Sequence, residues 1–218
     1  MIRRIRREHC LKLLAKKPDW KILDLGCGLD GIKLANVYAD IENYSSDYQG
    51  FRFVQTEASK TPFEDKEFDF VFCNHIAEHV PDPQAFCNEL GRISKRGFIE
   101  VPLPFFDNFV IGNSNPPPHG HVWWVTYDDI RNNIVFKERK RIVEEMALPR
   151  DTSFLLPFFR ESMILELYWE DNIEGRIDDA VFEYDSGTTK SEPTKYDLTD
   201  RQGVRHRPRP SFWKPRLL

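Results

Sequence analysis

The chain has 218 residues, of which 30% are charged, and a formal net charge of −4 at pH 7. This length suits one domain with a full core, because chains usually divide beyond about 250–300 residues, and the acidic balance argues against a globally basic nucleic-acid-binding protein. The unpaired spacing of the four cysteines predicts neither a zinc knuckle nor a disulfide framework. Because no apolar run approaches the ~18 residues of a membrane helix and the arginine-rich start lacks a signal-peptide core, we expect a cytoplasmic protein.

The first predicted element is a helix over residues 3–17. Apolar side chains recur on one face of this segment, and arginine and lysine occupy the rest. We therefore expect residues 1–20 to form an N-terminal helix that packs on the domain that follows.

A strand over residues 21–25 comes next and runs directly into a glycine-rich turn. Gly26 and Gly28 allow the backbone to turn tightly and to approach a ligand closely, and open α/β sheets bind ligands at the carboxyl ends of their strands. Asp24, two places before the first glycine, supplies a carboxylate suited to a cationic ligand. The turn also fits the dinucleotide pattern G-x-G-x-x-G, but the next acid that ends a strand-like run, Asp40, follows too soon for the expected spacing of about 20 residues.

Four further strands are predicted, at about 36–40, 52–55, 69–73 and 97–101. Asp82 before Pro83 predicts the start of a helix, because the aspartate can cap the first turn and the missing proline N–H costs nothing there.

From residue 22 to about residue 102, six segments in order resemble the class I S-adenosylmethionine-dependent methyltransferases, in particular the type 11 group. The segments are 21–28, Asp40-Ile41, 53–63, 67–71, 74–83 and 97–102. The resemblance implies an α/β fold with a Rossmann-like, doubly wound, mostly parallel seven-stranded sheet. Residues 163–169 and 180–185 would form its final antiparallel hairpin, within a methyltransferase domain of residues 1–185.

The same resemblance implies S-adenosyl-L-methionine as cofactor and assigns residues to each part of it. We expect Asp40 to hold the ribose hydroxyls, with Asp47 as the alternative. Asp30, where the family commonly has glycine, and a short connection between residues 28 and 40 depart from the family pattern. The remaining expected contacts are Asp24, Gly26, Cys27 and Gly28 at the methionine end, Ile41 beside the ribose, Glu57 and Ala58 at the adenine, and Asn74 and His75 near the sulfonium.

A long proline-rich connection over residues 103–125 follows the fifth of these strands. Connections beyond about 12–15 residues are often functional lids, so we interpret this one as an acceptor-site flap. Methyl transfer to a hydroxyl needs a base, and histidine is the usual one near neutral pH. The candidates are His79, His119 and His121, and we prefer His121 because Gly120 and Val122 leave it free to project.

Two other local patterns concern a further helix and a possible metal site. Thr126-Tyr-Asp-Asp129 is similar to a capping box and predicts another helix. His75-Ile-Ala-Glu78-His79 matches the inverted zinc-peptidase motif, which must lie within a helix. Because this pattern directly follows a predicted strand and ends at Pro81, we expect no metal.

Residues 186–218 are polar and contain several prolines, and we expect a basic, flexible tail. The basic ends suit an anionic carrier or a membrane surface, where the protein would be peripheral. We expect a methyltransferase that O-methylates a sugar, a glycan precursor or another small molecule. The alternatives are an RNA or protein methyltransferase that docks through the tail, and a non-catalytic cofactor-binding partner subunit.

Overall fold

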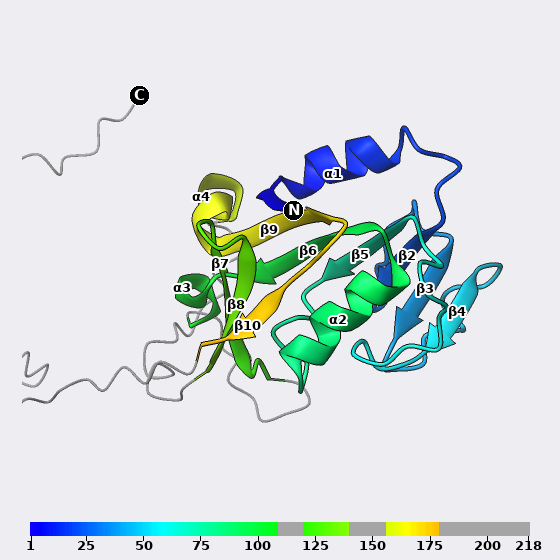
Figure 1. Ribbon diagram of the computed structural model, residues 1–218. Helices are drawn as coiled ribbons and strands as arrows, with labels where there is room; N and C mark the ends of the chain where they lie inside the picture. The colour runs from blue at the N-terminus through cyan, green and yellow to red at the C-terminus, as the bar shows by residue number, and fades with distance from the viewer. Residues whose placement is uncertain (109–119, 140–155, 179–218) are drawn as a thin grey trace, which may run out of the picture. The chain divides into compact units, whose positions relative to one another are not determined.

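The computed structural model describes residues 1–108, 120–139 and 156–178 (Figure 1). Within these ranges, no helix is long and apolar enough to cross a membrane. The predicted strand at 180–185, the predicted tail and His119 lie outside the described residues. The elements are β1 (Ile2–Arg4), α1 (Arg7–Leu14), β2 (Ile22–Leu25), β3 (Val37–Asp40), β4 (Arg52–Gln55), β5 (Phe70–Asn74), α2 (Pro83–Ile93), β6 (Arg96–Pro102), α3 (Pro104–Asp107), β7 (Trp123–Asp128), β8 (Asn133–Glu138), α4 (Leu156–Met163), β9 (Ile164–Glu170) and β10 (Gly175–Ile177).

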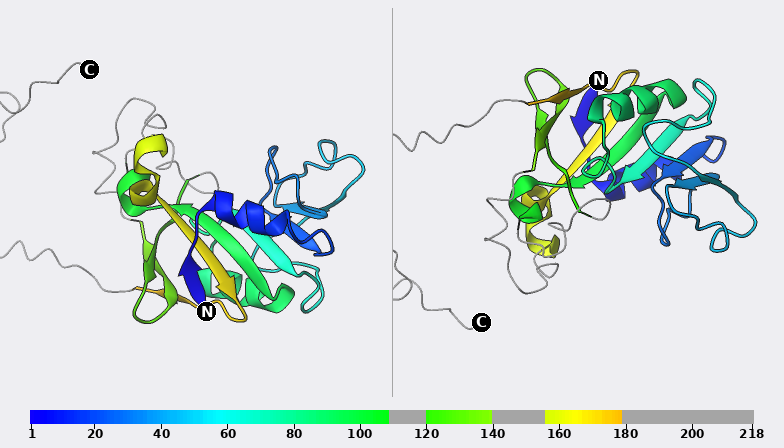
Figure 2. Two further views of the ribbon diagram at one scale, coloured as in Figure 1. Left: turned by 90° about the horizontal axis from the view of Figure 1, so that it is seen from above. Right: turned by 90° about the horizontal axis from the view of Figure 1, so that it is seen from below.

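The main sheet has seven strands in the order β1-β9-β6-β5-β2-β3-β4. Strands β2 to β6 run parallel to one another, and β9 is antiparallel to both of its neighbours. Helices α1 and α2 lie on opposite faces of this sheet (Figure 2). The predicted α/β class and the seven-stranded, mostly parallel, doubly wound sheet are thus confirmed.

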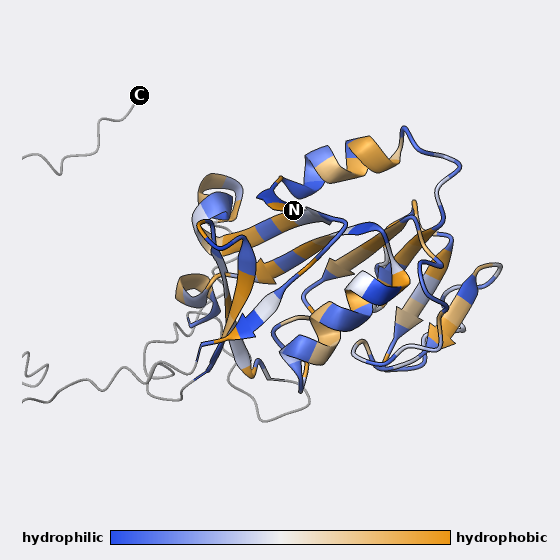
Figure 3. Cartoon of the chain, in the orientation of Figure 1, coloured by the Kyte–Doolittle hydropathy of each residue, from blue (hydrophilic) through white to orange (hydrophobic). Residues whose placement is uncertain are grey.

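Both faces of the sheet are apolar, as expected for strands covered on two sides. Helix α2 begins at the predicted position, where the Asp82 carboxylate accepts hydrogen bonds from the N–H groups of Gln84 and Ala85 at 3.0 Å. Phe86, Leu90 and Ile93 are fully buried on the sheet side of this helix, and the central strands carry the hydrophobic colours in Figure 3. Burial of each such side chain contributes about 1.5–3 kcal/mol, which fixes α2 against the sheet.

The N-terminal edge of the sheet differs from the prediction. Residues 2–4 form strand β1 instead of the start of a helix, and Ile2 lies opposite Trp169 of β9. The predicted helix over residues 3–17 was too long, because α1 covers only Arg7–Leu14. At Arg3 and Arg4, pairing with β9 satisfies the backbone instead and places Arg3 over the Tyr168 ring at 4.7 Å. Strand β1 occupies the place beside β9 that the predicted hairpin would have filled.

A smaller sheet has the order β10-β8-β7, and β7 and β8 form an antiparallel hairpin. The predicted helix start at Thr126–Asp129 is therefore wrong. Strand pairing takes the backbone of β7, and the Asp128 carboxylate accepts hydrogen bonds from the N–H groups of Ile130 and Arg131 in the hairpin turn. The residue that caps this turn is Asp128, and not the Thr126–Asp129 pair on which the helix prediction rested.

Candidate cofactor site and adjoining histidine cluster

A cavity of about 320 Å³ lies at the carboxyl ends of β2, β3 and β5. The strand order reverses between β2 and β5, and this is where open α/β sheets bind their ligands. Several predicted site residues come together around it, among them Gly26, Asp40 and Glu57. The full lining is Leu25, Gly26, Asp40, Ile41, Thr56, Glu57, Ala58, Ser59, His75, Ile76, His79, Val80 and Pro81.

The glycine turn after β2 forms one wall of the cavity. Gly26 has φ +76° and Gly28 has φ +53°, a left-handed conformation that side chains disfavour. A Cβ atom on Gly26 would come within 2.0 Å of the Ile76 side chain, which also lines the cavity. Glycine at this position therefore leaves room for the Ile76 side chain as well as allowing the turn.

Asp40 is held in place by its own backbone surroundings. Its two carboxylate oxygens accept hydrogen bonds from the N–H of Gly28 at 2.9 Å and from the N–H of Glu42 at 3.0 Å. A carboxylate offers about four lone-pair positions, so two remain for a ligand. Asp40 is thus positioned to accept hydrogen bonds from a pair of hydroxyls in the cavity.

Asp24 lies behind the turn and is not part of the cavity lining. Its carboxylate is 2% exposed and accepts a hydrogen bond from the Ile32 N–H at 2.7 Å. Burial raises the pKa of Asp24 to about 7, against the opposing effect of that hydrogen bond. In this structure Asp24 organises the loop that follows the glycines, together with the Tyr48 hydroxyl, which accepts from the Gly31 N–H at 2.9 Å.

The short connection from β2 to β3 is described in full and contains no helix. In place of a helix, the rings of Tyr38 and Tyr48 stack on each other beside this loop, with their centroids 4.2 Å apart. Cys27 is buried among them and, like Gly28, does not line the cavity.

Two buried polar atoms near the cavity have no hydrogen-bond partner in the described part of the chain. They are Oγ of Ser59, in the cavity lining, and Oδ1 of Asn74, at the end of β5. Unpaired buried polar atoms are costly, and ligands commonly satisfy them. Together with the free lone pairs of Asp40, they fit a polar nucleoside cofactor.

His75 follows β5 in a left-handed conformation, with φ +54°. Its Nδ1 lies 3.2 Å from Glu78 Oε1 and its Nε2 lies 3.5 Å from Glu100 Oε1. Burial alone would lower the pKa of His75, but hydrogen bonds with Glu100 and Glu78 raise it to about 9. His75 is therefore an imidazolium at neutral pH, beside the predicted place of the methyl-bearing sulfur.

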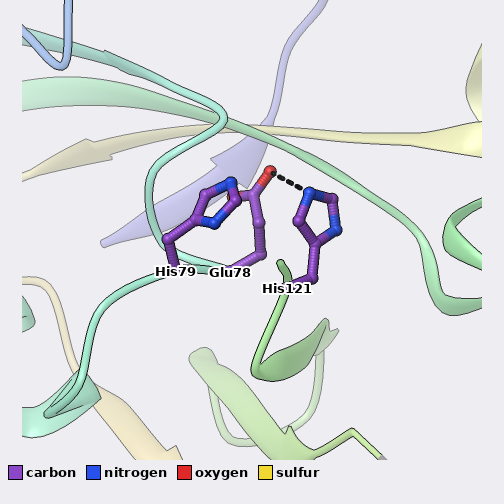
Figure 4. Close-up of side chains that lie close together, drawn as sticks. All are labelled: Glu78, His79 and His121. Atoms are coloured by element: carbon purple, nitrogen blue, oxygen red, sulfur yellow. Dashed lines mark ion pairs between the residues drawn. The ribbon is translucent and has the colours of Figure 1, made fainter. Parts of the chain in front are cut away.

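A second cluster adjoins the cavity, where the described end of the predicted flap meets the loop after β5. The backbone N–H groups of Val122 and Trp123 donate to the Glu78 carbonyl at 2.9 and 3.1 Å. This contact brings His121 next to Glu78 and His79, although they are far apart in the sequence (Figure 4). The rings of His79 and His121 are perpendicular, with centroids 4.6 Å apart.

Asp107 and Glu78 were missing from the predicted site. Nδ1 of His121 hydrogen-bonds the Asp107 carboxylate, which also accepts from Nε of Arg139 at 2.9 Å. Nε2 of His121 lies 4.0 Å from Glu78 Oε1. The sequence motif at 75–79 contained Glu78, but nothing in the sequence connected Asp107 with His121.

The N-terminal arginines are engaged within the fold. Arg4 lies 3.6 Å from Asp129, Arg6 forms an ion pair with Glu161, and Arg7 lies 3.9 Å from Glu100. These ion pairs reduce the positive charge that this end of the chain can present to an anionic partner.

Residues 23–99 match the protein family described as "Methyltransferase domain". The chain is 34% identical over 115 residues to cycloartenol-C-24-methyltransferase 1 of Oryza sativa subsp. japonica, a match that covers 42% of this chain and 33% of the relative. It is 30% identical over 102 residues to the probable tocopherol O-methyltransferase, chloroplastic, of the same plant, covering 38% and 28%. The chain therefore spans about a third of the length of the curated relatives it matches.

Among solved structures, the chain is similar to a candidate S-adenosylmethionine-dependent methyltransferase from Listeria monocytogenes. The TM-score is 0.46 at 13% identity, over 74% of this chain and 94% of that one.

Residues 23–99 thus match a methyltransferase domain. The class I methyltransferases that this segment resembles use S-adenosylmethionine, and the cavity described above lies within the matched segment.

Proposed function

We propose that the chain binds S-adenosylmethionine and transfers its methyl group to an oxygen of a sugar, a glycan precursor or another small molecule. The observation that carries the proposal is Asp40 at the rim of the cavity, oriented by two backbone N–H groups with lone pairs left for the ribose. Gly26, Glu57 and Ala58 would contact the rest of the cofactor.

The bound cofactor supplies a methyl group on a positively charged sulfur, which is already activated for transfer. The protein then has to align the acceptor, and such positioning can lower the barrier by about 7–11 kcal/mol. The carbon–sulfur bond breaks with its electron pair left on sulfur, and the carbon–oxygen bond forms as the acceptor oxygen loses its proton.

His121 is the group we propose to take that proton. The Asp107 carboxylate holds Nδ1 of His121, which leaves Nε2 to accept a proton from the acceptor hydroxyl. His79, whose pKa is lowered by burial, stays neutral beside it. An oxygen acceptor is also consistent with the name of the tocopherol relative, whereas the cycloartenol relative is named for a carbon acceptor.

The test is calorimetric titration of the full chain with S-adenosylhomocysteine, with NAD as the control ligand. We expect micromolar binding of the first and none of the second. Glycan precursors and other hydroxyl compounds are then screened with the methyl donor, and product analysis identifies the methylated atom. Failure to bind S-adenosylhomocysteine would contradict the proposal.

The salt dependence of acceptor binding separates this proposal from the nucleic-acid alternative. A small neutral acceptor should bind almost independently of salt. Steep salt dependence that disappears when residues 201–218 are removed would instead indicate a polyanionic acceptor.

A further inference from the structure

We infer that Glu78, His79 and His121 form a binding site for a divalent first-row transition-metal ion at the rim of the cofactor cavity. The site itself rests on the geometry of these side chains. Its use in methyl transfer, argued last, rests on the proposed function.

The three side chains supply a suitable donor set. Each offers one ligand atom, two imidazole nitrogens and one carboxylate oxygen, and these atoms lie within 4.8 Å of one another. Two histidines and one carboxylate are the ligands of catalytic zinc sites and of non-haem iron sites, and in both they leave coordination positions open. A tetrahedral ion with bonds of about 2.1 Å needs its ligands roughly 3.4 Å apart, so the ligand atoms must move closer together by up to about 1.4 Å.

The Glu78 carboxylate is buried beside the two histidines and has one unsatisfied oxygen. Its side chain is 1% exposed, and its Oε2 has no hydrogen-bond partner within residues 1–108, 120–139 and 156–178. Its other oxygen contacts His75 at 3.2 Å. A buried carboxylate oxygen without a partner is costly, and a bound cation would satisfy it.

The surroundings of both histidines favour metal binding through Nε2. Nδ1 of His121 is held by the Asp107 carboxylate, and Nδ1 of His79 lies 3.1 Å from the Gly120 carbonyl oxygen. Each acceptor fixes the tautomer with the proton on Nδ1, so that the Nε2 lone pair is free to bind a cation. Metal-ligating histidines almost always donate their second ring N–H in this manner.

The backbone keeps the ligands together. Glu78 and His79 lie in the loop after β5, and His121 lies just before β7. Two hydrogen bonds from Val122 and Trp123 to the Glu78 carbonyl join these segments, and the Trp123 indole N–H donates to the Val80 carbonyl at 2.7 Å. The fold therefore brings the three ligands close to one another before an ion binds.

The motif at 75–79 matches the inverted zinc-peptidase pattern, which the fold does not support because His75 and His79 are not in a helix. The third ligand that the motif lacked is provided by His121, from the predicted flap, while His75 is turned between Glu78 and Glu100. Two of the motif's residues thus contribute to a different site.

His79 also lines the cofactor cavity. An acceptor hydroxyl bound to the ion there would lose its proton more readily, because a bound cation lowers the pKa of its oxygen ligands. Nε2 of His121 can hold either the ion or the acceptor proton. In the metal-bound protein His121 is therefore a ligand, and the ion replaces the base in assisting deprotonation.

The test uses the full chain without a histidine tag, treated with chelator and dialysed. Co²⁺ is added while the visible absorption is recorded, and Zn²⁺ is titrated by calorimetry. We expect one equivalent of each to bind, and His121→Ala and His79→Ala to weaken binding by at least about 100-fold, as expected when one of three ligands is lost. Asp107→Asn, which alters the support of His121, should weaken it about 10–100-fold.

His9→Ala is the matched control, since His9 is an exposed histidine on α1, and it should bind the ions as the unaltered chain does. Metal binding that is absent, or equally strong in His121→Ala, would overturn the inference. S-adenosylhomocysteine titration of the same samples keeps the two proposals separate. Cofactor binding without metal binding would remove only the metal site, and metal binding without cofactor binding would remove the methyltransferase function.

Discussion

Asp24 and Asp40 lie at the carboxyl ends of neighbouring parallel strands, one residue before the end of β2 and at the end of β3, yet the fold gives them opposite surroundings. Asp40 lines the cavity and has lone pairs to spare, whereas Asp24 is buried behind the glycine turn and bonded to the Ile32 N–H. The first is suited to bind a ligand directly, and the second shapes the loop that the ligand meets.

Replacing Asp40 should weaken cofactor binding. Asp40→Ala would remove the charge-assisted hydrogen bonds that we propose with the ribose, worth about 1.5–3 kcal/mol, and should lower the affinity for S-adenosylhomocysteine roughly 10–100-fold in calorimetry. Asp47→Ala is the control, since Asp47 is exposed and was the alternative acid. An effect of the Asp47 change alone would show that the ribose lies elsewhere.

Asp24 should make stability depend on pH. Burial raises its pKa from 3.8 to about 7, so between these values the folded chain keeps a proton that the unfolded chain has released. Stability must then fall as pH rises through this window. Asp24→Asn, which has no charge to bury, should be more stable than the unaltered chain by roughly 2–4 kcal/mol at pH 8.

The difference in the free energy of unfolding between Asp24→Asn and the unaltered chain should shrink toward pH 4. Urea unfolding of both proteins at pH 5 and pH 8 measures this difference. Identical pH profiles for the two proteins would contradict a buried, proton-binding Asp24.

Among the elements, those with a signal in their own residues were predictable. The five parallel strands are short apolar runs bounded by turn residues, and Asp82-Pro83 predicts the start of α2. Residues 3–4 and 126–128 were misassigned because their conformation depends on partner strands. Residues 3–4 pair with β9, far along the sequence, and residues 126–128 pair with β8, the next strand of the hairpin. Local propensity cannot register such pairing.

The cap of α2 gives a direct test at this scale. Asp82→Ala removes the acceptor for two N–H groups and should lower the free energy of unfolding by about 1 kcal/mol. Asp19→Ala, at an exposed aspartate outside any helix, should leave it within about 0.5 kcal/mol. Urea unfolding compares the two, and equal effects would show that the cap contributes nothing specific.

In the molecule as a whole, strand β1 connects the two sheets. The Ile2 N–H donates to Asn132 Oδ1 at 2.9 Å, and the Ile2 carbonyl accepts from Asn132 Nδ2 at 2.8 Å and from the Tyr127 hydroxyl at 2.9 Å. The histidine cluster is likewise assembled from separate parts of the sequence, since His121 reaches Glu78 only because β7 docks on the loop after β5. The cofactor cavity could therefore be predicted from one continuous segment, whereas the Glu78–His121–Asp107 arrangement could not.

Asn132→Gly should weaken this connection between the sheets. Glycine keeps the left-handed conformation of residue 132, φ +56°, but removes both hydrogen bonds to Ile2. We expect a loss of about 1–3 kcal/mol in the free energy of unfolding. Asn172→Gly, in an exposed turn, controls for the entropy of glycine, and an equal loss there would contradict a specific role for Asn132.

The pairing of β1 with β9 sets an order of events during synthesis. Residues 2–4 leave the ribosome well before their strand partner, residues 167–169. The parallel strands β2 to β6 can assemble while β1 still has no partner, and an exposed strand edge is prone to pair with other chains. Closure of the sheet edge is therefore a late, long-range step, and shielding of the first residues should matter most before β9 emerges.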